Sequence, residues 1–282
     1  MEDDSSLIKF WFNLGACAIV AIGYFERPDD ASFWYYLRLS LWAVGVAVVG
    51  HLLSAWDERR TQCRRDKRAA KILKRLKADP ARVQTPYFVY LRPFFTTGNM
   101  PIERRRGGLL SAIPFFPAYF EDRIESRSVE LEKTLSKALV CSGLLIGLGK
   151  PGEQIGAGRI ATDDATWQDD VRLLVQHAKY LLLIPSERPG TSWEVNLTRD
   201  GGYLDKCVFL MPPKLYFSSI DIEDAWSRTR ESLKKDGVDL PEYQSSGAMF
   251  KLNASGKPQN KQPLPLDSER QLLVNVDKLL KQ

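Results

Sequence analysis

Three stretches of this sequence combine residue types that bind phosphates or sugars, and each comes at the end of a strongly apolar run. The first is "RPF", which follows Leu91 and contains Arg92. The second is Gly147–Arg159, "GLGKPGEQIGAGR", and the third is Ser186–Leu197, "SERPGTSWEVNL". Ligands of open parallel sheets bind beyond the carboxyl ends of the strands, so we expect the three stretches to lie at one edge of a sheet.

The glycine-rich stretch has five glycines together with Lys150 and Arg159. Glycines let backbone N–H groups approach a ligand closely, and the two cations could hold a phosphate or a ribose. The spacing matches GxGxxG formally, but no helix start follows it directly, so it is not a dinucleotide fingerprint. The alternative is a flexible loop that needs positive φ angles. Across the three stretches, the candidate ligand-binding residues are Arg92, Gly149, Lys150, Gly152, Gly156, Gly158, Arg159 and Trp193.

Glu194 is the candidate catalytic residue, and two interpretations of it stay open. Its carboxylate could polarise a ribose hydroxyl or stabilise an oxocarbenium-like centre, as carboxylates do in glycosidic cleavage. Alternatively, Thr191-x-x-Glu194 is a capping box, in which Glu194 accepts a hydrogen bond from the backbone N–H of Thr191. The spacing alone favours the cap. Trp193 could pack beside Glu194 in either case.

Short apolar runs alternate with helical patterns after residue 86. The strand-like runs are 87–94, 144–149, 180–185 and 207–213. The helical patterns are 128–143, 163–178, a helix starting near 191, and helices near 221–235 and 268–281. Fully apolar strands that alternate with helices predict an α/β fold, with a parallel sheet covered on both faces. Residues 96–127 are expected to be an insertion, and the polar segment 245–265 a mobile loop.

The first 56 residues contain two stretches that are apolar on nearly every side, at about 7–25 and 39–56. Each is close to the roughly 20 residues that cross a hydrocarbon core. Aromatic residues lie near the ends of both stretches, as they do at membrane interfaces. The sequence therefore predicts a transmembrane hairpin over residues 1–56, a basic juxtamembrane linker over 57–80 and a cytosolic α/β domain over 81–282.

The linker is strongly basic, with ten lysines and arginines between residues 59 and 77. Because Lys and Arg stay on the cytoplasmic side, it predicts that both termini are cytoplasmic, in a multi-pass protein of the bacterial inner membrane. Anionic lipids would favour this arrangement. The predicted membrane-surface residues are Arg59, Arg60, Arg64, Arg65, Lys67 and Arg68. A nucleic-acid role competes with this interpretation, but the stretch has no aromatics for base stacking, and as a helix its charges are expected on all sides.

The stretch 87–213 resembles the TIR-like division of bacterial nucleotide-handling Rossmannoid domains. The resemblance is carried by "YFVYLRPF", "IGLGKPGEQIGAGRI", "WQDDVRLLVQHAKYLLLIP", and "TSWEV" before "CVFLMPP". It implies a flavodoxin-like parallel sheet. In catalytic members a glutamate that opens the helix after the third such strand cleaves the nicotinamide–ribose bond of NAD, and Glu194 is the matching position.

The layout also resembles two-helix membrane effectors of bacterial antiviral defence, including those paired with retron reverse transcriptases. This resemblance implies an inner-membrane effector whose TIR-like domain senses a signal or partner and whose hairpin perturbs the bilayer in abortive infection. The alternatives are a membrane-tethered NAD-cleaving hydrolase, or a membrane-anchored nucleotide- or nucleic-acid-binding module.

The expected cofactors and partners follow from the two resemblances and their alternatives. We expect no required cofactor and no metal site, with NAD or another nucleotide as a possible ligand. The expected partners are the lipid bilayer, further copies of the chain through the transmembrane helices, and a defence-system partner such as a reverse transcriptase–RNA complex.

Overall fold

The computed structural model of the chain describes residues 4–25, 33–92, 123–152, 155–163, 165–214, 222–265 and 268–281. Its centre is a seven-stranded sheet in the order β3-β2-β1-β4-β5-β6-β7. The strands are β1 (Tyr87–Leu91), β2 (Leu144–Leu148), β3 (Gly158–Ile160), β4 (Tyr180–Leu183), β5 (Cys207–Met211), β6 (Ala248–Leu252) and β7 (Pro258–Pro263). The first five are parallel, and β6 and β7 are antiparallel to their neighbours. The predicted α/β fold with a mostly parallel sheet is confirmed.

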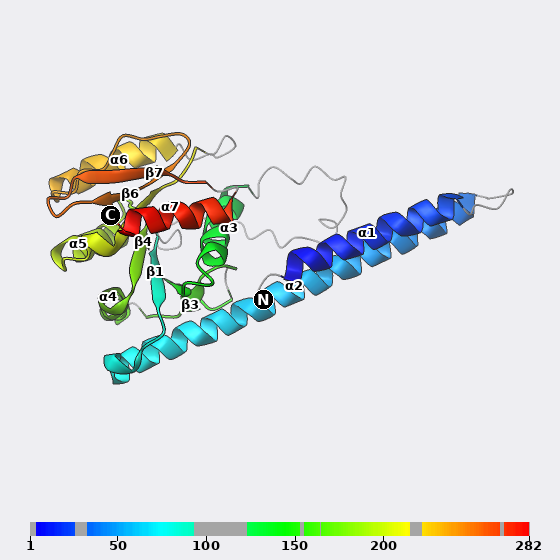
Figure 1. Cartoon of the computed structure of the whole chain (residues 1–282), viewed down its shortest axis with the longest axis horizontal. Coiled ribbons are helices and arrows are strands. Elements are labelled where there is room, and N and C mark those ends of the chain that lie inside the picture. Colours follow the sequence, from blue (N-terminus) through cyan, green and yellow to red (C-terminus); the bar gives the residue numbers. More distant parts are fainter. Residues whose placement is uncertain are drawn as a thin grey trace.

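Helices cover both faces of this sheet (Figure 1). The side chains of β1 alternate between the faces, with Val89 in one core and Phe88 in the other. The helices of the domain are α3 (Arg123–Ala138) and α7 (Glu269–Lys281) on the Phe88 face, and α4 (Trp167–His177), α5 (Pro189–Asp200) and α6 (Ile222–Lys235) on the Val89 face. Two short 3-10 helices, η1 (Pro80–Arg82) and η3 (Leu204–Lys206), join these elements.

The prediction of a mobile loop at 245–265 is wrong. Strands β6 and β7 form an antiparallel pair there, and all five residues of β6 are buried. Strand β7 has the sequence "PQNKQP", which is typical of a loop. It is nevertheless a strand, and it is almost fully exposed because it lies at the edge of the sheet. Prolines and charges are the residues that edge strands tolerate, because one side of such a strand pairs with no neighbour.

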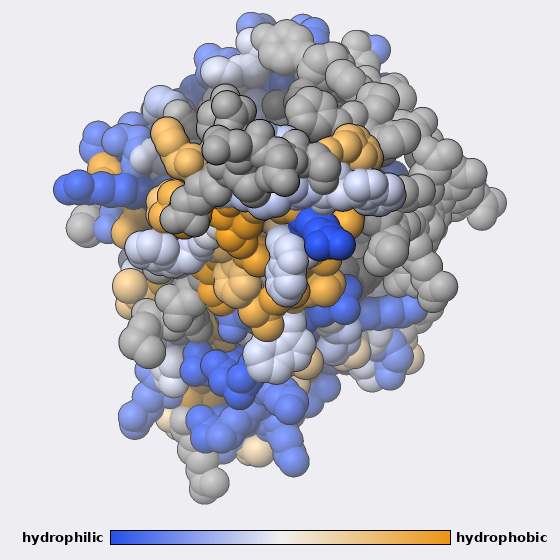
Figure 2. Space-filling view, turned by 90° about the vertical axis from the view of Figure 1, so that its right-hand side faces the viewer, coloured by the Kyte–Doolittle hydropathy of each residue, from blue (hydrophilic) through white to orange (hydrophobic). Residues whose placement is uncertain are grey.

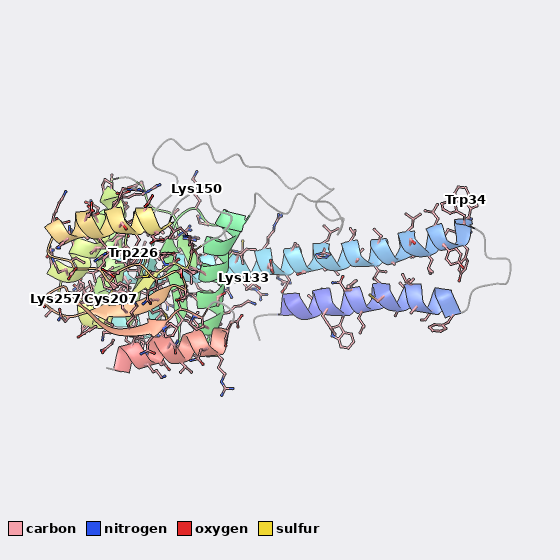
Figure 3. All side chains as sticks on the ribbon, turned by 90° about the horizontal axis from the view of Figure 1, so that it is seen from above. Trp34, Lys133, Lys150, Cys207, Trp226 and Lys257 are labelled. Atoms are coloured by element: carbon pink, nitrogen blue, oxygen red, sulfur yellow. The ribbon has the colours of Figure 1, made fainter. Side chains whose placement is uncertain are left out.

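Two long helices precede the sheet and lie side by side (Figures 1 and 3). Helix α1 (Asp4–Phe25) runs antiparallel to α2 (Phe33–Ala78). Gly23 faces Leu39 at one end of the pair, and Gly50 faces Phe12 at the other. A Cβ on either glycine would overlap the facing side chain, so both glycines permit the close approach of the two helices.

The surface of this helix pair is apolar. All exposed large hydrophobic side chains of the described residues, except Val140 and Val274, belong to α1 or to α2 up to Trp56. Figure 2, which faces this end of the molecule, shows hydrophobic residues gathered there and hydrophilic residues below and around them. By length and composition α2 can cross a membrane, whereas the apolar stretch Phe10–Gly23 of α1 is shorter. An apolar surface of this extent needs lipid or another apolar partner.

Helix α2 does not end at Trp56 but continues to Ala78 as a single helix of 46 residues. Ala69, Ile72, Leu73 and Leu76 lie in the core on the Val89 face of the sheet. Their spacing places them on one side of the helix, which explains why that side docks. One side of residues 57–78 therefore packs into the core of the domain, although their charge predicted a separate linker.

Candidate functional site

The three predicted stretches leave the same edge of the sheet. Strands β1, β2 and β4 are parallel neighbours, and the N–H of Ile184 donates to the carbonyl of Leu91 at 2.9 Å, so the ends of β4 and β1 are adjacent. The chain moves to β2 on one side of β1 and to β4 on the other. This is the switch point at which doubly wound sheets bind ligands.

The glycine-rich loop after β2 is held by α2. Gln62 accepts a hydrogen bond from the N–H of Gly156 at 2.8 Å and donates to the carbonyl of Ala157 at 2.8 Å. Arg65 Nη1 donates to the carbonyl of Gly156 at 3.0 Å. Residues 153 and 154 of the loop lie outside the described residues.

Asp66 also links α2 to this loop. Its carboxylate accepts hydrogen bonds from the N–H groups of Gly152, at 2.9 Å, and Arg159, at 2.7 Å. It also accepts from Gln62 at 2.7 Å. Asp66 is 5% exposed, so its two bonds to the backbone of residues 152 and 159 fix the loop on the helix, and the bond from Gln62 orients the buried carboxylate. We call Gln62, Arg65 and Asp66 the α2 clamp.

Under this loop lies a buried ion pair between Glu132 of α3 and Arg159 of β3. Arg159 Nη2 lies 2.6 Å from Oε1 and 2.5 Å from Oε2 of Glu132, and the side chains are 1% and 0% exposed. Glu132 also accepts from the N–H of Ala157 at 2.9 Å, and Arg159 donates to the carbonyl of Leu148 at 3.0 Å. Burial lowers the pKa of Arg159, and the neighbouring Glu132 opposes that change.

Arg92 adds a second cation beside this pair. It follows β1 directly, and its Nε lies 3.7 Å from Oε2 of Glu132. Tyr90 is also fully buried here, and its pKa is raised by burial and by Glu132. Arg92 and Arg159 face one carboxylate, so the cluster of these four residues has a net charge of +1 and would attract an anion at the end of β1. Of the predicted insertion 96–127, residues 96–122 lie outside the described residues, whereas residues 123–127 form the start of α3.

The predicted loop residues divide into buried and exposed groups. Gly156 and Gly158 are buried, and a Cβ at these positions would press on the Glu132 carboxylate and on the backbone of Arg65. Their lack of a side chain therefore follows from packing. Gly149, Lys150 and Gly152 reach the surface, and Figure 3 shows Lys150 projecting from the domain.

Glu194 is not a helix cap, so that interpretation is wrong. Helix α5 begins at Pro189, its N-cap is Arg188, and no side chain caps it. The first turn is fixed instead by Pro189, a residue favoured at N1, so Glu194 falls in the second turn. Its side chain is 2% exposed, and its Oε2 has no hydrogen-bond partner among the described residues. Burial raises the pKa of Glu194 to about 8.

Trp193 packs between helices. Its ring meets that of Trp167 of α4 edge to face at 4.9 Å, and the guanidinium of Arg172 lies 5.8 Å from its centre. The aromatic pair and the cation account for its position without a ligand.

The predicted membrane-surface residues lie on the part of α2 that follows Trp56. Arg59, Arg60, Arg64, Lys67 and Arg68 are exposed. Arg65 is 7% exposed and bonds to Gly156, so its assignment to the membrane surface is wrong. It faces inward because it shares the docked side of the helix with Ala69 and Ile72.

Sequence reasoning missed Gln62, Asp66 and Glu132. Glu132 lies between Leu131 and Leu135, on the apolar side of a predicted helix, and a charge at such a position signals a buried partner. In the described part of the chain, no group of three or more His, Cys, Asp or Glu side chains could hold a metal ion.

Comparisons of the chain with protein-family models, with curated proteins and with solved structures found no match.

Proposed function

We propose that this protein is an inner-membrane effector of a bacterial antiviral defence system. A TIR-like cytosolic domain would sense a nucleotide or a partner at the carboxyl ends of its strands. Helices α1 and α2 would form a transmembrane hairpin, with both termini in the cytoplasm, that perturbs the bilayer and causes abortive infection.

The observation that carries this proposal is the continuity of α2. One helix contains the apolar segment and also holds the glycine-rich loop through Gln62, Arg65 and Asp66. A ligand that favours a different loop position must break or shift these bonds, and the helix moves with them as a rigid element. The candidate site and the membrane segment are therefore linked through one structural element.

The α2 clamp gives the test. In cells that carry the protein, phage infection is expected to collapse the membrane potential, which a potential-sensitive dye measures. Asp66→Ala leaves the N–H groups of Gly152 and Arg159 without their acceptor, so the loop separates from α2. We expect this variant to reach the membrane at a normal level but to preserve the potential.

Glu58→Gln is the matched control, because Glu58 lies on the same helix and makes a partly exposed ion pair with Lys133. Figure 3 shows Lys133 where α3 meets α2. The control should depolarise cells as the wild type does. A wild-type protein that leaves the potential intact during infection contradicts the proposal.

A second candidate function is NAD cleavage by a membrane-tethered hydrolase. It is favoured by Glu194, which is buried and serves no cap. A carboxyl group with a pKa near neutral can act as a general acid or base. In this case the purified full-length protein consumes NAD, and Glu194→Gln abolishes that activity while leaving the protein folded. If the wild type and Glu194→Gln leave the same NAD level, this function is excluded.

A further inference from the structure

Seven of the ten basic residues between 59 and 77 lie on one face of α2, contrary to the expectation that the charges lie all around it. At 3.6 residues per turn, the buried residues 62, 65, 66, 69, 72, 73 and 76 occupy one side of the helix. The opposite side is made by exposed cations. We define the basic face as Arg60, Arg64, Lys67, Arg68, Lys71, Lys74 and Arg75.

Apart from Arg68, the cations of this face form no ion pair with an acidic residue in the described part of the chain. Asp66 is the only acidic residue between 59 and 77, and it is buried in the α2 clamp. Asp170 of α4 reaches Lys77, at 2.5 Å, and Glu58 reaches Lys133 of α3, at 2.9 Å. In Figure 1 the cytosolic half of α2 runs along the outside of the domain, with the sheet on its other side. All seven side chains of the basic face are exposed, and Lys71, Lys74 and Arg75 line a groove on it.

The far end of the basic face is too distant from a membrane to serve lipid headgroups. This step rests on the proposed function, in which α2 crosses the bilayer and leaves it near Trp56. Lys74 lies about 27 Å along the helix axis from Trp56, at 1.5 Å per residue. Even at a tilt of about 40°, Lys74 stays about 20 Å from the interface. The Debye length at physiological salt is only about 8 Å, so headgroup charge hardly acts there.

The chemistry of the face also argues against a protein partner. Protein interfaces depend on a few buried aromatic or apolar anchors surrounded by polar residues. The exposed residues that accompany the cations, such as Cys63 and Ala70, are small, and no aromatic side chain follows Trp56 on α2. A row of cations without aromatics suits a phosphate backbone contacted without base stacking.

We infer that the basic face of α2 binds the phosphate backbone of a double-stranded nucleic acid, independently of its sequence. Binding would occur on the same helix whose opposite side holds the glycine-rich loop. A nucleic acid would thus bind α2 on its basic face, while a small ligand would affect α2 through the glycine-rich loop at the edge of the sheet.

The test uses the full-length protein in phosphatidylcholine nanodiscs, with a fluorescent 20-base-pair duplex of DNA or of RNA as the probe. Anisotropy gives the affinity between 50 and 200 mM salt. With about four phosphates contacted, the affinity should fall roughly 100-fold over this range. The variant K67Q/K71Q/K74Q/R75Q should bind at least about 30-fold more weakly at 100 mM salt and lose most of the salt dependence.

The control K234Q/K235Q/R270Q/K278Q removes the same charge from exposed positions on α6 and α7 and should bind as the wild type does. Equal binding by the wild type and the α2 variant overturns the inference. So does a loss of duplex binding in nanodiscs that contain phosphatidylglycerol, because lipid then occupies the face. The assay repeated in detergent micelles does not need membrane insertion, so its outcome is separate from that of the proposed effector function.

Discussion

Replacing Glu132 with alanine should lower the free energy of unfolding of the domain by about 3–5 kcal/mol, the range for breaking a buried ion pair. Arg159 would keep its charge while fully buried, with Arg92 3.7 Å from the vacated carboxylate position and no anion between them. Folded domains are stable by only about 5–15 kcal/mol, so this loss is severe. Thermal unfolding of the full chain in detergent, followed by circular dichroism, should show Tm lowered by roughly 10 °C.

Lys133→Ala is the matched control for this change. Lys133 is the next residue on α3, and its pair with Glu58 is partly exposed, so its loss should cost less than about 1 kcal/mol. The double variant Glu132→Leu/Arg159→Met should recover part of the stability, because apolar residues can replace a buried pair. A Tm of Glu132→Ala equal to that of the wild type would show that the pair contributes little to the fold.

Replacing Glu194 with glutamine should stabilise the protein above about pH 5, by about 4 kcal/mol at pH 7.5. The pKa of Glu194 is raised by burial from 4.5 to about 8, so the folded state retains a proton between these values that the unfolded chain has released. The wild type therefore loses stability as the pH rises from about 4.5 to 8. Glutamine is neutral throughout, like the protonated acid, so the variant does not carry this dependence.

Chemical denaturation at several pH values measures this effect, with Glu242→Gln as the control. Glu242 is exposed, and its replacement should leave the pH profile of the wild type intact. If the profiles of the wild type and Glu194→Gln run parallel from pH 4.5 to 8, Glu194 is ionised in the folded protein and its burial has no consequence for stability.

The parallel part of the fold could be predicted from the sequence because its strands are short and wholly apolar. Runs such as "YFVYL" and "CVFLM" can only be buried, and all their residues are. Strand β3 could not be predicted, because it has three residues and contains Arg159. Strand β7 has a loop-like composition, and it is defined by its pairing with β6, a relation that local patterns do not contain.

The candidate site was predicted in its location but not in its construction. The apolar strand ends place Arg92 and the glycine-rich loop at one edge of the sheet. The side chains that build the site come from distant positions, since Gln62 and Asp66 bond to residues about 90 positions later. The interpretation of residues 57–77 rested on their charge. It overlooked the helical spacing of the buried residues, because Gln62, Arg65 and Asp66 lie among the apolar residues on that side of α2.

The central claim is that α2 is one helix running from a membrane into the core of a cytosolic domain. Labelling of the native cysteines tests this claim most directly. Cys17, Cys63 and Cys141 are exposed on the protein, and Cys207 is buried. A membrane-impermeant maleimide, followed by mass spectrometry, should label Cys63 and Cys141 in inside-out vesicles and neither of them in intact spheroplasts. Cys17 should be labelled in neither, because lipid surrounds α1. Labelling of Cys17 by this reagent, or of Cys63 from outside, would contradict the account.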